Sequence, residues 1–165
     1  MITLRKLRKT DEEQLTSLIN TIETNLPNKK FWLPINNISR EHFLDDDWTY
    51  FLGLFDGDKL IGASGLFLNE HEYKESLSYC TNVKLPVAEI SRVMVLPEYR
   101  GNNYLFKINN ELLNIAKNFG IKTILVTIHP DNAPSQHSFE KLGAKKVTQI
   151  IKYESFLRDV LLLEL

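Results

Sequence analysis

The sequence has few of the features that mark disulfide-stabilised, membrane-spanning or nucleic-acid-binding proteins. Cys80 is the single cysteine, so no internal disulfide can form, as expected in a reducing compartment. No run of about 18 apolar residues occurs, and residues 1–8 alternate polar and apolar side chains where a secretory signal has an unbroken apolar centre. Twenty basic and twenty-one acidic side chains give a net charge of −1, which offers no electrostatic footprint for nucleic acid. These absences predict a cytoplasmic protein that binds neither membranes nor nucleic acids.

Stretches rich in glycine, serine or proline are also missing, and no internal repeat is visible. The 165 residues, of which 43% are hydrophobic, are therefore expected to form one domain, 1–165, around a single core. His71, His129 and His137 show no metal-ligand spacing with Cys80, so no metal site is predicted.

The most informative segment that is present covers residues 91–112. An apolar run ends at Pro97, a turn follows at Arg100 and Gly101, and the apolar spacing then becomes helical. Backbone N–H groups at the start of such a helix lack partners and the helix dipole is positive there, so the pattern favours a bound phosphate. Arg100 adds a cation that can hold phosphate oxygens in a fork. The strings of the nucleoside-triphosphate loop and of the dinucleotide turn are both absent, which excludes the commoner phosphate loops.

A second strand and helix follow the first pair. Residues 121–128 are almost continuously apolar, as in a strand that is buried on both faces. Asn132 or Asp131 can cap the next helix, Pro134 suits its first turn, and Gly143 suits a left-handed end.

Patterns along the rest of the chain predict the element order β-α-α-β-β-β-α-β-α-β-β. A possible capping box at Thr10 and Glu13 opens the first helix, and Asp56-Gly57-Asp58 indicates a tight hairpin. Gly62 and Gly65 within the third strand indicate a close backbone approach. Strands are expected at 2–7, 50–55, 59–68, 87–96, 121–128, 145–153 and 156–164, and helices at 10–22, 39–44, 104–119 and 133–142.

The segment V-x-P-x-Y-R-G resembles the signature of the GNAT superfamily of N-acetyltransferases, V-x-P-x-[YF]-[RQ]-[RG]-x-G-x-[GA]. The matching residues are Val95, Pro97, Tyr99, Arg100 and Gly101. Two positions differ from the signature. Asn103 stands where the family has its second glycine, and asparagine is the best substitute at positive φ. Leu105 stands at the final glycine or alanine, where its side chain must point into the core or crowd the cofactor.

The following segment resembles the next family motif, N-x-x-[AS]-x-x-x-[YF]-x-[KR]-x-G-[FA]. Its matches are Asn132, Ser135, Phe139, Lys141 and Gly143. The resemblance implies an α/β (α+β) fold, with a mixed, centrally splayed sheet of about seven strands and helices on both faces. It also implies acetyl transfer from acetyl-CoA, whose pyrophosphate would lie on the loop amides and whose pantetheine arm would pair with strand backbone. The implied cofactor-binding residues are Val93, Met94, Val95, Arg100, Gly101, Asn102, Asn103, Tyr104, Leu105, Phe106, Asn132, Ser135 and Phe139.

Acetyl transfer to an amine needs a group that accepts the amine's proton, because alkyl amines are mostly protonated at neutral pH. Glu89 is the candidate base, and strand alternation places Glu89, Ser91 and Val93 on one face and Met94 on the other. A strand-end glutamate paired with Arg92 or with solvent is the alternative interpretation of Glu89.

Two further roles follow from the resemblance. A backbone N–H near Met94 or Val95, at a bulge of the fourth strand, would stabilise the oxyanion. The family often uses a helix tyrosine to protonate the thiolate, but Phe139 fills that position and cannot donate a proton. Tyr104, Tyr153 or water are the alternatives, and His129 and His137 are interpreted as incidental.

The acceptor is expected to be an amine of a small molecule or peptide, entering near residues 25–40 and 69–85. Two other functions fit the sequence. One is a CoA-binding regulatory module without turnover, suggested by Phe139 and Leu105. The other is an acyltransferase using a longer donor such as acyl carrier protein, because Glu89-Ile-Ser-Arg92 resembles the E-x-S-R segment of acyl-homoserine lactone synthases. Either a monomer or a homodimer is compatible with the sequence.

Overall fold

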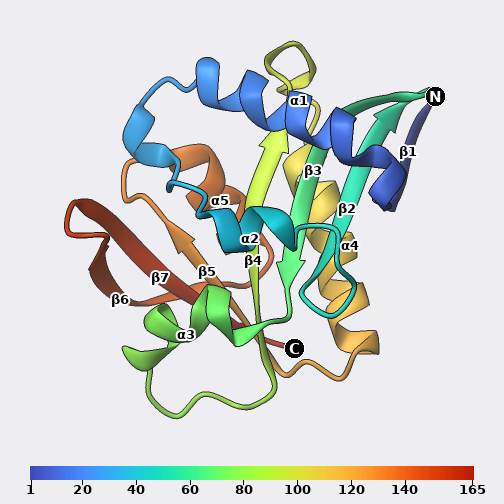
Figure 1. The fold of residues 1–165 in the computed structure, drawn as a ribbon. Helices are drawn as coiled ribbons and strands as arrows, with labels where there is room; N and C mark the ends of the chain where they lie inside the picture. Colours follow the sequence, from blue (N-terminus) through green and yellow to red (C-terminus); the bar gives the residue numbers. More distant parts are fainter.

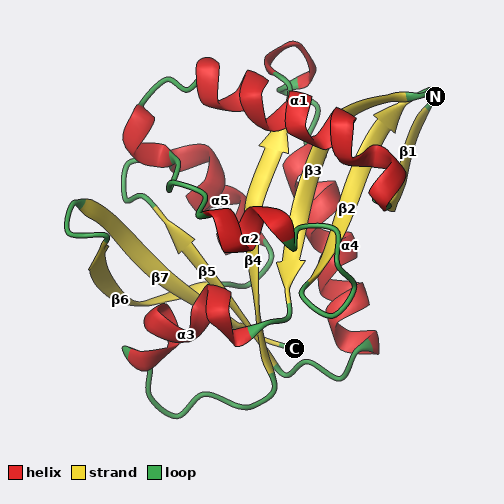
Figure 2. Ribbon diagram, viewed as in Figure 1, coloured by secondary structure: helices red, strands yellow, loops and turns green.

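A seven-stranded sheet with helices on both faces forms the protein in the computed structural model, which describes all 165 residues (Figures 1 and 2). The strands are β1 (Ile2–Lys6), β2 (Thr49–Asp56), β3 (Lys59–Phe67), β4 (Val87–Val95), β5 (Thr123–Ile128), β6 (Lys145–Lys152) and β7 (Phe156–Glu164). The helices are α1 (Glu12–Thr24), α2 (Asn37–Glu41), α3 (Glu70–Ser78), α4 (Tyr104–Asn118) and α5 (Ala133–Lys141). The α/β fold class is as predicted, and the seven strands occur at the predicted places along the chain.

The strand order β1-β2-β3-β4-β5-β7-β6 contains one parallel pair, β4 with β5. Only Val87–Glu89 of β4 pair with β5, where their partners are Thr123–Leu125. Beyond Glu89 the carboxyl-terminal halves of β4 and β5 diverge, as Figure 1 shows, so the sheet is splayed at its centre. Backbone groups along that opening are therefore available to a ligand.

A β-bulge interrupts β4 where the splay begins. Ser91 pairs with Gly65 and Met94 pairs with Ala63, so two β4 residues oppose one β3 residue. Paired residues of neighbouring strands share a face, so Ser91 and Met94 point the same way. The simple alternation expected from the sequence, with Met94 opposite to Ser91, is wrong because the extra residue shifts the side-chain register.

Gly62 allows β3 to approach β4 just beyond the bulge. A Cβ atom at Gly62 would lie 2.8 Å from the Met94 carbonyl oxygen, which is backbone and cannot move freely. At Gly65 the nearest atoms are side-chain carbons of Phe67 and Phe51, at 2.7 and 2.9 Å. The predicted close backbone approach is confirmed at Gly62, whereas Gly65 makes room for aromatic packing.

Amphipathic helices cover the two faces. In α1, Leu15, Leu18, Ile19 and Ile22 are buried at helical spacing, and α1 packs on β3 and β4 in front of the sheet in Figure 1. Helix α4 lies behind the sheet against β2, β3 and β4, with its apolar stripe in the same core. None of the helices combines the length and the apolar character that a bilayer crossing requires.

The predicted capping box at Thr10 and Glu13 is wrong. A 3-10 turn at Lys9–Asp11 precedes α1, and the Asp11 carboxylate accepts hydrogen bonds from the Arg8 N–H and from the Arg5 guanidinium. The ion pair between exposed Arg5 and buried Asp11 holds Asp11 in place, and α1 begins only at Glu12.

Helix α3 was not predicted, because its sequence E-H-E-Y-K-E-S-L-S shows no continuous apolar stripe. Asn69 caps it by accepting a hydrogen bond from the His71 N–H at 2.9 Å. Tyr73 and Leu77 pack against a small cluster formed by Val87, Leu125, Ile150 and Val160. Tertiary contacts therefore stabilise α3, whose local sequence pattern does not predict a helix.

Candidate active site

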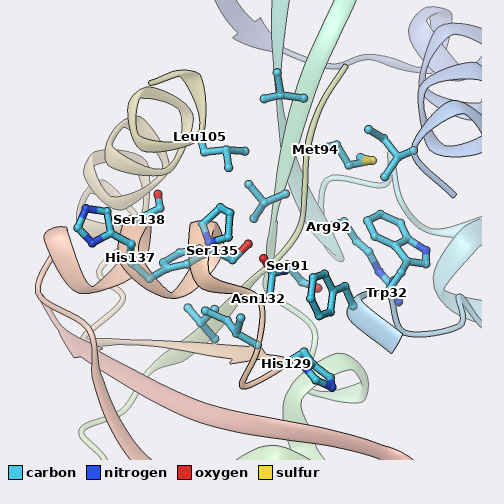
Figure 3. A pocket seen from close by; sticks show the side chains of 18 of the residues that line it. Trp32, Ser91, Arg92, Met94, Leu105, His129, Asn132, Ser135, His137 and Ser138 are labelled. Atoms are coloured by element: carbon cyan, nitrogen blue, oxygen red, sulfur yellow. The ribbon is translucent and has the colours of Figure 1, made fainter. Parts of the chain in front are cut away.

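A cavity of about 650 Å³ occupies the opening between β4 and β5. Its walls come from the bulged half of β4, the end of β5, the start of α4, helix α5 and the segment 26–33, with Arg158 of β7 (Figure 3). Fifteen of its thirty lining residues are hydrophobic, so the wall offers apolar contact area together with polar groups that can orient a ligand.

The loop between β4 and α4 has the geometry expected of a phosphate site. Gly101 and Asn103 both have positive φ, at +83° and +61°, and Asn103 is the residue immediately before α4. The left-handed conformation accounts for asparagine at this position, as predicted. Arg100, Gly101 and Asn103 line the cavity beside the first turn of α4, where unpaired N–H groups favour an anion.

Leu105 fulfils both predicted alternatives, a side chain in the core and a side chain at the cofactor cavity. Its half-buried side chain packs against the main core and also lines the cavity, on the side of α4 that faces the opening (Figure 3). Two other predicted residues do not line the cavity. Asn102 is exposed and donates to the Tyr99 carbonyl at 3.0 Å, and the Phe106 ring lies 5.2 Å from the Lys141 ammonium nitrogen.

The two sides of the opening bring together the remaining predicted residues. Val93, Met94 and Val95 line it from β4, and Asn132, Ser135 and Phe139 line it from α5 and the loop before it. In Figure 3 Met94 lies across the opening from Asn132 and Ser135. Since β4 has no strand partner on its β5 side here, that edge of its backbone can pair with an extended ligand.

Glu89 is buried beside this cavity and does not line it. Only 4% of the residue is exposed, and its Oε2 atom has no hydrogen-bond partner. Burial raises the pKa of Glu89 to about 7, and the Glu72 carboxylate adds to the rise while Lys152 and Arg92 oppose it. A carboxyl group with a pKa near 7 can exchange a proton at neutral pH. Ser91, two residues along the strand, does line the cavity.

Arg92 lies in the bulge with φ +57° and holds the segment that forms the cavity mouth. Its guanidinium donates to the carbonyl oxygens of Leu33 at 2.6 Å and Pro34 at 3.3 Å, and lies 4.9 Å from the ring centroid of Trp32. The Trp32 indole N–H in turn donates to Glu23 at 3.1 Å.

Arg158 is a site residue that the sequence did not indicate. It is only 1% exposed, lines the cavity, and donates to the carbonyl oxygens of Leu157 and Lys30, both at 2.7 Å. No motif marks this position, because β7 is remote in sequence from the segments that carry the family signature. No motif marks Lys152 either. Its side chain is buried, and its charge lowers the pKa of Glu89 without a hydrogen bond between the two groups.

The proton donor for a leaving thiolate has several candidates in the structure. Phe139 is buried in the cavity wall, and Tyr104 lines the same cavity from the first turn of α4. Tyr153 is 52% exposed in the β6–β7 turn and does not line the cavity. His129 and His137 both line it, although the sequence pattern pointed to an incidental role.

Of the two predicted acceptor segments, only the first reaches the cavity. Residues 26, 27 and 31–33 line it, whereas no residue of 69–85 does, because Glu70–Ser78 form α3 below the opening. No cluster of three or more histidine, cysteine or acidic side chains has the arrangement of a metal site. Burial raises the pKa of the Cys80 thiol, which fits an unreactive cysteine.

Comparison with known proteins gives a consistent result. The family model of the acetyltransferase (GNAT) family matches residues 12–144. Among solved structures, the ribosomal-protein-S18-alanine N-acetyltransferase from Escherichia coli superposes with a TM-score of 0.74 at 15% identity, covering 99% of this chain and 94% of that one. A probable acetyltransferase from Staphylococcus epidermidis gives 0.74 at 19% identity, covering 99% of each chain. Arabidopsis thaliana NAA60 in complex with acetyl-CoA gives 0.75 at 13% identity, covering 99% of this chain and 98% of that one. No curated protein matches the sequence significantly.

Proposed function

Because the chain belongs to the acetyltransferase (GNAT) family, an acetyl-CoA-dependent family of acetyltransferases, we propose that it transfers the acetyl group directly to an amine of a small molecule or peptide. The observation that carries this proposal is the splayed β4–β5 opening, which ends at a loop with two left-handed residues before α4. An extended thioester arm and its phosphates fit these two features in that order along the cavity.

The donor would be held mainly by backbone groups. The amides from Arg100 to Phe106 would surround the pyrophosphate, and Arg100 would add a charge-assisted contact. Val93, Met94 and Val95 would pair with the arm, with Asn132, Ser135 and Phe139 on its other side. Asn102 and Phe106 would contribute through their amides, since their side chains point elsewhere.

The bulge would supply the oxyanion donor. Because the irregular pairing lies between Ser91 and Met94, we assign this role to a backbone N–H next to the bulge, near Met94 or Val95. The thioester carbonyl of the bound donor supplies the electrophile.

Glu89 would accept the proton that the acceptor amine must lose. Its pKa of about 7 suits that task, and Ser91 or a water molecule would relay the proton, because Glu89 itself is behind the cavity wall. Tyr104 is the side-chain hydroxyl best placed to protonate the thiolate, since Tyr153 lies outside the cavity.

Two measurements test the proposal. Calorimetry with acetyl-CoA is expected to show saturable binding at one site, and thiol release is expected with some members of an amine panel. Binding without thiol release from any amine would favour the regulatory module, for which the buried Phe139 in place of tyrosine is the supporting observation. Binding of neither acetyl-CoA nor CoA, with acylation from an acyl carrier protein, would favour the longer donor.

A further inference from the structure

Two arginines line the cavity next to the 30–34 segment without a carboxylate partner. Arg92 and Arg158 both line it, and neither takes part in any of the ion pairs of the protein. By contrast, the Arg5 guanidinium forms two 2.8 Å bonds to the Asp11 carboxylate. A buried guanidinium without an anion is costly, because its charge is removed from water with no compensating charge.

The positive charge of Arg92 acts on the Arg158 guanidinium. Burial and, to a smaller extent, the positive charge of Arg92 together lower the pKa of Arg158 to about 10. Nearby carboxylates, Glu89, Glu72 and Glu23, offset the charge of Arg92, but no acidic residue acts on Arg158. The positive charge at Arg158 is therefore the uncompensated one.

Both side chains are held in place and still have free donors. Backbone carbonyls of residues 30–34 accept bonds from both, so one short segment bridges the two guanidinium groups. A guanidinium carries five N–H donors, and each of these uses two. The remaining donors suit the oxygens of a carboxylate or phosphate, which arginine binds as a fork.

This pair is separate from the proposed pyrophosphate loop. Arg92 lies in the bulge, and at a rise of about 3.3 Å per residue the strand carries the chain roughly 13 Å further to Leu96 before the Arg100 loop begins. Arg158 lies past the end of β5, on a strand that contributes nothing to that loop. An anion at the arginine pair would therefore belong to the acceptor.

We propose that the acceptor is a compact amine that carries a carboxylate or phosphate, and that Arg158, with Arg92, binds this anionic group. The inference rests on the proposed function and names the class of its acceptor. The cavity of about 650 Å³ must also hold the donor's arm, which leaves room for a small acceptor only. The amine then lies towards Ser91 and Glu89, with the anionic group anchored beyond the bulge.

Matched amines test this proposal. Thiol release is compared for β-alanine, O-phosphoethanolamine and ethanolamine, which carry a carboxylate, a phosphate and neither group. We expect kcat/KM to be higher for one anionic amine than for ethanolamine by about tenfold or more. The two anionic compounds distinguish a carboxylate from a phosphate. Equal or better turnover of ethanolamine would overturn the proposal.

Variants separate binding from a structural role. Arg158→Gln is expected to lower kcat/KM for the preferred anionic amine by about tenfold more than for ethanolamine, and Arg158→Lys to restore part of the difference. The control Arg8→Gln removes an exposed arginine far from the cavity and should leave the ratio unchanged. If Arg158→Gln lowers both substrates equally, the side chain only supports the 30–34 segment and the proposal is wrong.

A binding measurement keeps this proposal distinct from the proposed function. Calorimetry with N-acetyl-β-alanine and N-acetyl-O-phosphoethanolamine, in the presence of CoA, needs no turnover. Binding of either compound to the wild type that is lost in Arg158→Gln supports the anion site even if no amine is acetylated. Absence of binding to the wild type overturns the site even if neutral amines are acetylated.

Discussion

At the scale of single residues, Glu89 combines deep burial with a carboxylate oxygen that has no hydrogen-bond partner. If Glu89 is the base, the ionised form is the active one, so kcat/KM should rise with pH through about 7 and level off above it. Glu89→Gln is expected to lower kcat/KM by roughly 10²–10⁴-fold and to remove this limb of the profile. A pH–rate profile of both proteins with one amine checks it, and full turnover of the variant over the whole range would exclude the role.

Asn103 permits a second prediction at this scale. Its φ of +61° is left-handed, a conformation that costs most side chains roughly 1–2 kcal/mol. Asn103→Gly should therefore retain CoA affinity, whereas Asn103→Val should weaken it by about tenfold, because a β-branched residue leaves this conformation. Calorimetry with CoA measures both, and equal affinity of the valine variant would show that the loop conformation does not control binding.

The residues that line the cavity could be predicted from the sequence only where they belong to a motif. The cavity-lining residues Arg100, Gly101 and Asn132 all came from the two sequence motifs. Arg158 and Lys152 belong to the last hairpin, where alternating apolar and polar residues predict only a strand. Their positions beside Glu89 and Arg92 depend on how β7 and β6 pack next to β5, which is a property of the sheet.

At the scale of elements, the contact between β3 and β4 next to the bulge can be tested directly. Gly62→Ala would place a Cβ 2.8 Å from the Met94 carbonyl oxygen, so we expect a loss of about 1–3 kcal/mol in the free energy of unfolding. Turnover should fall as well, because the displaced strand carries the proposed oxyanion donor. Denaturant unfolding and thiol release measure the two effects.

Gly120→Ala is the matched control for this prediction. Gly120 has φ +78° and follows α4, with no atom within 4 Å of an added Cβ. The alanine should cost about 1 kcal/mol through backbone strain alone and leave turnover unaffected. If Gly62→Ala is destabilised to the same degree but keeps full turnover, the bulge geometry does not contribute to catalysis.

Elements with strong periodicity were predictable, and those that depend on packing were not. The long helix α4 and the strands were recognised from their apolar spacing, close to their observed bounds. Helix α3 was missed because it is stabilised by contacts of Tyr73 and Leu77 with a distant cluster. The bulge was expected from the family resemblance, but its side-chain register was not, since one extra residue in a strand leaves no mark in the pattern of apolar residues.

At the scale of the whole molecule, Glu89 makes stability depend on pH. Its pKa rises from 4.5 to about 7 on folding, so between these values the folded chain holds a proton that the unfolded chain has released. The free energy of unfolding therefore falls by about 3 kcal/mol in total as pH rises through this interval. Above the interval Glu89 is ionised in both states, so it causes no further loss.

Glu89→Gln should remove that cost. We expect the variant to gain stability relative to the wild type between pH 4.5 and pH 8, by up to about 3 kcal/mol. Acidic groups with lowered pKa values, such as Asp11 and Asp159, titrate equally in both proteins and cancel in the comparison. Urea unfolding at the two pH values measures the difference, and a constant difference would show that Glu89 is not buried as a neutral acid.

The sequence by itself determined the family, the order of the strands along the chain and the turn before α4, because each depends on residues that are close together in the chain. A turn, a helix start and an apolar strand are local properties, and the motifs preserve them in order. Only the tertiary structure decided which groups meet where Arg92 and Arg158 line the cavity. The raised pKa of Glu89 and the unpaired charge of Arg158 arise from burial and from contacts across the sheet, and spacing along the chain does not encode those distances.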